Sequence, residues 1–137
     1  MFVFKNIFPQ FELIFFDIKI YMSHVPSETF INLASTMMPK IDIGNAINTT
    51  QRRFKAAFGV PPDICVILWR HIFDNVMSCT VPIHLLWTLF FLKVYNNLDT
   101  NSSIAGVDHK TFQKHTWDVI SALSCMEIVS LYLILMF

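Results

Sequence analysis

The chain has 137 residues and no formal net charge, with ten Lys and Arg against ten Asp and Glu. Its length fits one domain, and a hydrophobic fraction of 54% supplies more than enough side chains for a core. Only 15% of the residues are charged, against a usual value of about 25%, so we expect leftover apolar surface that meets lipid or another protein. The neutral balance excludes a strong whole-chain attraction to nucleic acid, so any basic patch must be local.

Residues 1–22 fit strand and helix patterns about equally well, and their structure stays undetermined. Residues 23–51 are rich in Pro, Ser, Thr and Asn, which is typical of a linker, with one short helix near Glu28 to Met38. The chain therefore divides into an undetermined N-terminal segment with its linker, a helical domain and an apolar C-terminal tail, over residues 1–48, 49–126 and 127–137.

The first clear helix begins at Thr50, a capping residue, and ends at Gly59. A second helix opens at Pro61-Pro62-Asp63, with Asp63 as its cap, and carries apolar residues at helical spacing as far as residues 73–75.

The stretch from Pro82 to Tyr95 is apolar on every side, which predicts a central helix packed on several faces. Thr100 or Asn101 then caps a short helix that ends at Gly106. Asp108 caps the last helix.

Periodicity divides the last helix into two sides. The inward stripe holds Phe112, Val119, Ile120 and Leu123, and the outward side holds Lys110, Gln113, Lys114, Asp118 and Ser121. Large aromatic residues dominate burial, so we expect three tryptophans to anchor the core: Trp69, Trp87 and Trp117.

Residues 101–115 combine a short helix, a turn centred on glycine and a second helix with a basic start. This order is typical of a helix-turn-helix, which places the start of its second helix where it can meet nucleic acid. The sequence therefore predicts a mainly α fold: a small helical domain containing a helix-turn-helix, after a poorly defined apolar N-terminal segment.

Several spaced motifs extend this pattern over about residues 52–123. In chain order they are Arg53-Phe54-Lys55, Phe58-Gly59, Cys65-Val66-Ile67-Leu68-Trp69, Pro82 to Tyr95, Gly106 to Phe112, and Trp117 with Ile120. Together they resemble the N-terminal helix-turn-helix region of Harbinger-like cut-and-paste transposases. The resemblance implies a DNA-binding region that precedes an RNase-H-like nuclease domain, in which three carboxylates hold two divalent metal ions.

We expect the chain to lack that nuclease domain, because residues 126–137 are an apolar tail where the resemblance implies a charged link to the first catalytic Asp. The resulting expectation is a truncated or domesticated remnant in the nucleus, with no enzymatic activity and no cofactor. Its expected partners are DNA and a full-length transposase or another protein that covers exposed apolar surface. Gln113 and His115 stand where the family tends to carry a basic and an aromatic residue, which weakens phosphate contact at 113.

Two sets of side chains are candidates for DNA contact. The first lies at one helix start, where it would neutralise phosphates, and consists of Arg52, Arg53 and Lys55. The second lies at the start and outer face of the last helix, where it would reach base edges or phosphates, and consists of His109, Lys110, Thr111, Gln113 and Lys114. Ordinary solvated helix faces are the alternative for both sets, and a pair between Lys114 and Asp118 fits that alternative.

The remaining reactive side chains indicate no chemistry. Cys65, Cys79 and Cys125 are odd in number and lack metal-ligand spacing, so we expect buried, reduced thiols rather than disulfides or a zinc site. No two of His71, His84 and His115 are four residues apart on one helix, so structural histidines are favoured over a metal or acid–base cluster.

A membrane-associated helical protein is the alternative function. The aromatic N-terminus and the tail from Ile128 to Phe137 favour it, although the tail is too short to span a bilayer. Charges at Glu12, Asp17 and Glu127 disfavour it, since each costs about 2.5 kcal/mol or more at bilayer depth.

Overall fold

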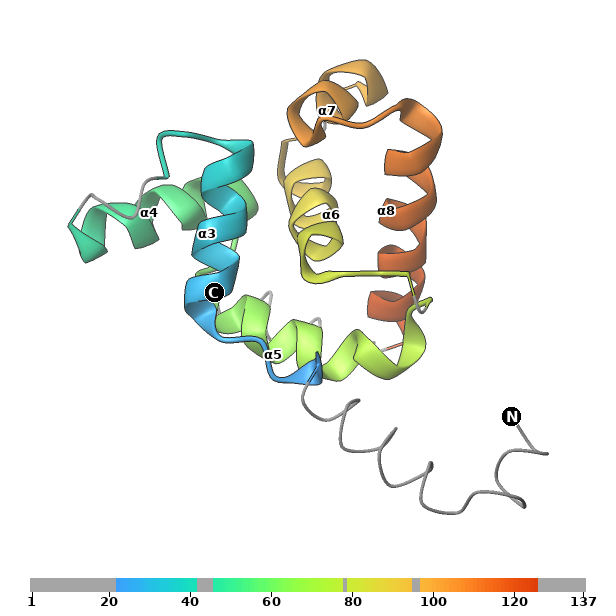
Figure 1. The fold of residues 1–137 in the computed structure, drawn as a ribbon, viewed down its shortest axis with the longest axis horizontal. Coiled ribbons are helices and arrows are strands. Elements are labelled where there is room, and N and C mark those ends of the chain that lie inside the picture. The colour runs from blue at the N-terminus through green and yellow to red at the C-terminus, as the bar shows by residue number, and fades with distance from the viewer. Residues whose placement is uncertain (1–21, 42–45, 78, 95–96, 126–137) are drawn as a thin grey trace, which may run out of the picture.

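The structure, a computed structural model, describes residues 22–41, 46–77, 79–94 and 97–125 (Figure 1). Within these ranges it contains six α-helices and no strand, which confirms the predicted mainly α class. The predictions for residues 1–21 and for the C-terminal tail fall outside the described residues.

Each helix overlaps one that the sequence predicts. In chain order they are α3 (Ser27–Met37), α4 (Ile47–Phe58), α5 (Pro62–Ile72), α6 (Pro82–Val94), α7 (Leu98–Ala105) and α8 (His109–Ser124). A short 3-10 turn, η1 (Phe73–Asn75), continues α5.

The helix ends follow the predicted glycines, whereas the predicted caps of α4, α5 and α7 are wrong. Gly59 ends α4 with a φ of 84° and Gly106 ends α7 with a φ of 76°, a region that favours glycine. Thr50 does not cap α4, because the helix begins at Ile47. Thr50 therefore lies inside the helix, and its side chain is buried. Asp63 does not cap α5 either: it lies in the first turn, where its charge suits the positive end of the helix dipole.

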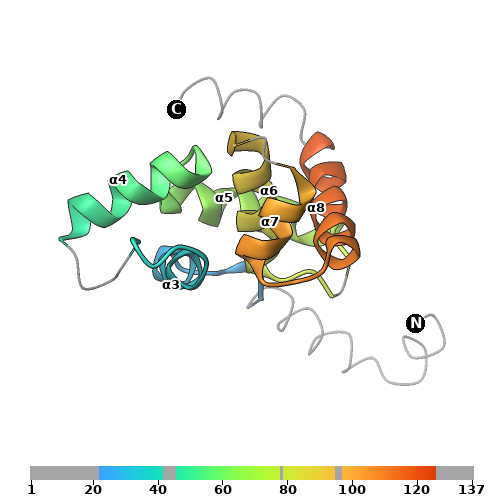
Figure 2. The ribbon, with the colours of Figure 1, turned by 90° about the horizontal axis from the view of Figure 1, so that it is seen from above.

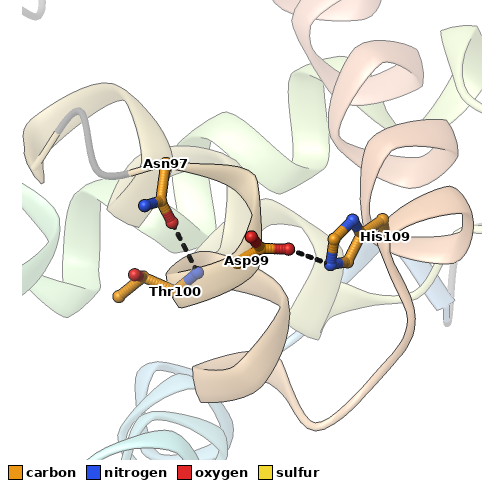
Figure 3. Close-up of polar contacts among 4 residues, drawn as sticks. All are labelled: Asn97, Asp99, Thr100 and His109. Carbon is orange, nitrogen blue, oxygen red and sulfur yellow. Dashed lines mark hydrogen bonds and ion pairs between the residues drawn. The ribbon is translucent and has the colours of Figure 1, made fainter.

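The cap of α7 is Asn97, not Thr100 or Asn101 as predicted. The Oδ1 atom of Asn97 accepts a hydrogen bond from the N–H of Thr100 at 2.8 Å (Figure 3). The cap of α8 is Asp108, as predicted, and its Oδ1 accepts from the N–H of Thr111 at 3.0 Å. Hydrogen bonds from Thr111 also hold the pKa of the Asp108 carboxyl below its ordinary value.

The central helix is α6, as its composition predicts. Its residues from His84 to Phe90 are all buried. It contacts α3, α4, α5, α7 and α8. Both ribbon views place α6 beside α8, with α7 across one end of the pair and α4 on the other side of α6 from α8 (Figures 1 and 2).

The segment interpreted as a linker contributes to the same core. Phe30 and Ala34 on α3 are completely buried, and Ile41 beyond the end of α3 is 1% exposed. α3 packs on α5 and α6, so these side chains join one cluster with residues of the later helices. The linker prediction missed this contribution because a single short helix with few large apolar residues resembles linker composition.

Two of the three tryptophans anchor the core. Trp69 and Trp87 are buried, and the indole N–H of Trp69 donates to the carbonyl of Met22 at 3.2 Å. The prediction for Trp117 is wrong, because its side chain is 53% exposed. Phe112 and Val119 lie two turns apart on the buried side of α8, and the position of Trp117 between them falls on the opposite side.

One of the three cysteines is buried as expected. Cys65 lies in the core, where burial raises the pKa of its thiol. Cys79 and Cys125 are exposed, so the prediction of buried thiols is wrong for these two. All three are free thiols.

Among the described residues, no single helix has both the length and the apolar composition needed to cross a membrane. α4 and the continuous segment Pro62–Asn75 meet that test only as a pair, with a bend of 51° between them.

The position of Phe30 predicts a large cost for removing its ring. We expect Phe30→Ala to lower the free energy of unfolding by about 3–5 kcal/mol, because the ring leaves a cavity in the core. Urea denaturation followed by circular dichroism measures this change. Met22→Ala, which truncates an exposed side chain, is the control and should shift stability by less than about 0.5 kcal/mol; equal effects would show that α3 does not contribute to the core.

Candidate nucleic-acid interface

The candidate site is the helix-turn-helix formed by α7, the residues 106–108 and α8. The N–H groups of Gly106 and Val107 donate to the carbonyl of Ser102 at 2.9 and 3.1 Å, which closes the end of α7. Asp108 then begins α8 directly. This short turn, with the Gly106 and Val107 N–H groups both bonded, fixes the start of α8 against α7.

The inward side of α8 is held to α6 by two pairs of rings. Trp87 and Phe112 stack with their centroids 5.7 Å apart, and His84 and His115 stack at 3.7 Å with 11° between their planes. Phe112 and His115 are one turn apart, so two successive turns of α8 are secured. The opposite side of α8 is therefore presented in a fixed position.

Asp118 fastens α8 to the loop before α6. Its Oδ2 accepts hydrogen bonds from the N–H of Met77 at 3.0 Å and from the hydroxyl of Thr80 at 2.7 Å. The predicted outward position of Asp118, in a surface pair with Lys114, is wrong. The loop passes alongside α8 and offers two donors, whereas a surface pair offers one screened contact.

The predicted DNA-facing residues of α8 are all on the surface. They are His109, Lys110, Thr111, Gln113 and Lys114. The imidazole of His109 forms an ion pair with Asp99 of α7 (Figure 3), and the N–H of Thr111 is taken by the cap. Lys110, Gln113 and Lys114 lie on the outward side of the first two turns.

The predicted set on α4 is separate from the set on α8. Arg52, Arg53 and Lys55 are all exposed. The guanidinium of Arg53, however, donates to the carbonyl of Lys40 at 2.7 Å, so it secures the chain after α3. α6 lies between α4 and α8 in both ribbon views, so the two basic sets do not form one surface (Figures 1 and 2).

Sequence reasoning missed the pairing of His84 with His115, because spacing along one helix carries no information about neighbours on another. The Nδ1 atom of His84 accepts a hydrogen bond from the N–H of Val81 at 3.0 Å. This bond satisfies a backbone group at the start of α6, in the manner of a capping box. The sequence does carry one signal for this pairing: His115 lies one turn after Phe112, beside the inward stripe of the last helix.

Both stacked histidines favour the neutral form. Burial lowers the pKa of His84 from 6.5 to about 4, with a further lowering from His115, while Asp118 acts in the opposite direction. Burial and the charge of Lys114 also lower the pKa of His115. Among the described residues, no group of three His, Cys, Asp or Glu side chains is placed to hold a metal ion.

The bonds to Asp118 predict a loss of stability when its side chain is removed. We expect Asp118→Ala to lower the free energy of unfolding by about 2 kcal/mol, because the Met77 N–H and Thr80 hydroxyl lose a charged acceptor. Chemical denaturation measures the loss. Lys114→Ala is the control and should cost less than about 0.5 kcal/mol; if it costs as much, the surface pair is the role of Asp118.

The histidine stack predicts acid sensitivity. The pKa of His84 in the folded protein lies below its ordinary value. The contribution of this side chain to the free energy of unfolding is therefore complete above about pH 6.5 and is lost as the pH falls toward 4. Between pH 7 and pH 5 we expect a loss on the order of 2 kcal/mol in the free energy of unfolding. Urea titrations at several pH values measure it.

Two variants test whether His84 causes the acid sensitivity. His84→Gln keeps an acceptor for the Val81 N–H but does not titrate, so its stability should change less between pH 7 and pH 5. His71→Gln removes an exposed histidine and should leave the pH dependence unchanged. A pH dependence that survives in His84→Gln would assign the effect to other groups.

The resemblance to Harbinger-like transposases rests on the sequence motifs between residues 52 and 123. No protein-family model matches the chain, and neither a curated protein nor a solved structure matches it.

Proposed function

We propose that this protein is derived from a transposase and binds double-stranded DNA in the nucleus through the outward side of α8. One observation carries the proposal: Lys110, Gln113 and Lys114 are exposed together on the first two turns of a capped helix whose other side is fixed to α6. A partner that meets α8 therefore meets two cations and an amide at a set spacing.

The proposed contacts divide into two kinds. Lys110 and Lys114 lie one turn apart and would neutralise phosphates, which supplies affinity but no sequence information. Gln113 lies beside them and would reach a base edge, since an amide can both donate to and accept from adenine in the major groove. An α-helix fits that groove, which is about 12 Å wide.

The start of α8 would contribute less to DNA binding than the sequence alone suggests. His109 is paired with Asp99, and Asp108 brings a second carboxylate to the same end of the helix. The DNA-facing set proposed for this chain is therefore smaller than the one that the sequence predicts, and its centre lies in the second turn of α8.

The set on α4 would not take part in the same contact, because α6 separates it from α8. Arg53 is also engaged with the Lys40 carbonyl. This separation provides a matched control, since charges reversed on α4 change the net charge of the protein equally but leave α8 unaltered.

The test measures binding of a fluorescein-labelled blunt duplex of about 20 base pairs by anisotropy, over a range of salt concentrations. Lys110→Glu with Lys114→Glu should weaken binding at least tenfold and lower the salt slope by about 0.9 for each phosphate that the variant no longer neutralises. Arg52→Glu with Lys55→Glu should lower affinity only through the general charge effect, and much less.

Two outcomes would overturn the proposal. One is the absence of binding by the wild-type chain at low salt. The other is a loss of binding in the α4 variant that equals or exceeds the loss in the α8 variant, which would move the interface to α4.

A further inference from the structure

One large aromatic side chain of the helix-turn-helix has no place in the core. Trp117 is 53% exposed, whereas Trp69 and Trp87 are 1% and 5% exposed. Its carbonyl accepts a hydrogen bond from the hydroxyl of Ser121, so its backbone is part of the regular helix and its exposure does not come from a frayed end. An indole held out into solvent by a rigid helix is a candidate contact residue.

Trp117 lies on the same side of α8 as the two lysines. Lys114 is one turn before it and Lys110 is two turns before it, and all three are exposed. The acidic residue of α8, Asp118, is tied to Met77 and Thr80 and does not neutralise this side. The outward side of α8 therefore joins two cations to a flat apolar surface, which fits a partner that is anionic and presents flat rings.

A base-paired duplex does not offer such rings to Trp117. In a duplex only the edges of the bases are open to a protein in the groove. Trp117 lies about 12 Å along the helix axis from His109, at about 1.5 Å for each residue, and the major groove is about 8.5 Å deep. If α8 enters by its first turns, Trp117 stays at the mouth of the groove, beside the sugar-phosphate backbone.

We propose that Trp117 stacks on an unpaired base of single-stranded DNA next to a duplex, while Lys110 and Lys114 hold the neighbouring phosphates. Unpaired bases expose their faces, and stacking on an aromatic side chain is the common way in which proteins hold them. The inference rests on the proposed function of α8 and narrows its substrate to DNA that carries a single-stranded end or gap.

A second copy of this chain is the less favoured occupant. A symmetric contact through the same side of α8 would bring four lysines together, Lys110 and Lys114 from each copy, while Asp118 stays engaged in its own subunit. Among the described residues of α8, no other carboxylate would balance the charge. DNA supplies the balancing charge itself.

The test compares three fluorescein-labelled probes by anisotropy: a blunt duplex, the same duplex with a single-stranded overhang of six thymines, and the thymine strand alone. The wild-type chain should bind the overhang probe about tenfold more tightly than the blunt duplex, the gain expected from one stacked base. Trp117→Ala should remove this preference and leave affinity for the blunt duplex unchanged. Trp117→Phe, which keeps a ring, should restore part of it.

The controls separate this inference from the proposed function. Lys110→Glu with Lys114→Glu should weaken binding to all three probes, and thermal unfolding should show that Trp117→Ala folds as the wild type does. Equal wild-type affinity for blunt and overhang duplexes would overturn the stacking inference and leave duplex binding by α8 in place. No binding to any probe would overturn both. A wild-type dimer that Trp117→Ala converts to a monomer in sedimentation, with no change in probe preference, would assign Trp117 to a second copy instead.

Discussion

The burial of α6 is the constraint on which the other helices depend. Its side chains are apolar on every side, so the helix is stable only when neighbours cover it all round, and α3, α4, α5, α7 and α8 do so. This requirement explains why a segment of linker-like composition supplies Phe30 and Ala34 to the core. Two polar side chains of α6 have partners close by: the Thr88 hydroxyl donates to the carbonyl of His84, and His84 accepts from the Val81 N–H. The buried indole N–H of Trp87 has no hydrogen-bond partner among the described residues.

Local signals account for the parts of the fold that the sequence predicts well. Gly59, Gly106 and Asp108 mark helix ends because backbone conformation and capping depend on one residue and its immediate neighbours. The central place of α6 follows from its composition alone. The predicted starts of α4 and α7 are misplaced because Ser, Thr and Asn near a helix start compete for the cap, and tertiary packing decides among them: Thr50 is buried, and Asn97 is the cap of α7.

The features that sequence could not supply all join residues far apart in the chain. Asp118 meets Thr80, His115 meets His84, and the Arg53 guanidinium meets the Lys40 carbonyl. Periodicity assigns a side of a helix to each of these residues, but not the partner it finds there. For Asp118 the assigned side is itself wrong, because a loop draws the carboxylate in. Trp117 faces outward, and the expectation that it anchors the core came from its size and not from periodicity. The sequence therefore predicts where the candidate site lies, and packing decides which residues belong to it.

The two sides of α8 have separate tasks, and this separation bears on how the chain can change over generations. Phe112, His115 and Asp118 hold the helix in place, while Lys110, Gln113 and Trp117 are exposed on its other side. Substitutions on the outward side are therefore nearly free of a folding cost, typically within about 0.5 kcal/mol. A scaffold of this kind can acquire or lose a binding partner by a few mutations, and its fold can persist after its original partner is gone.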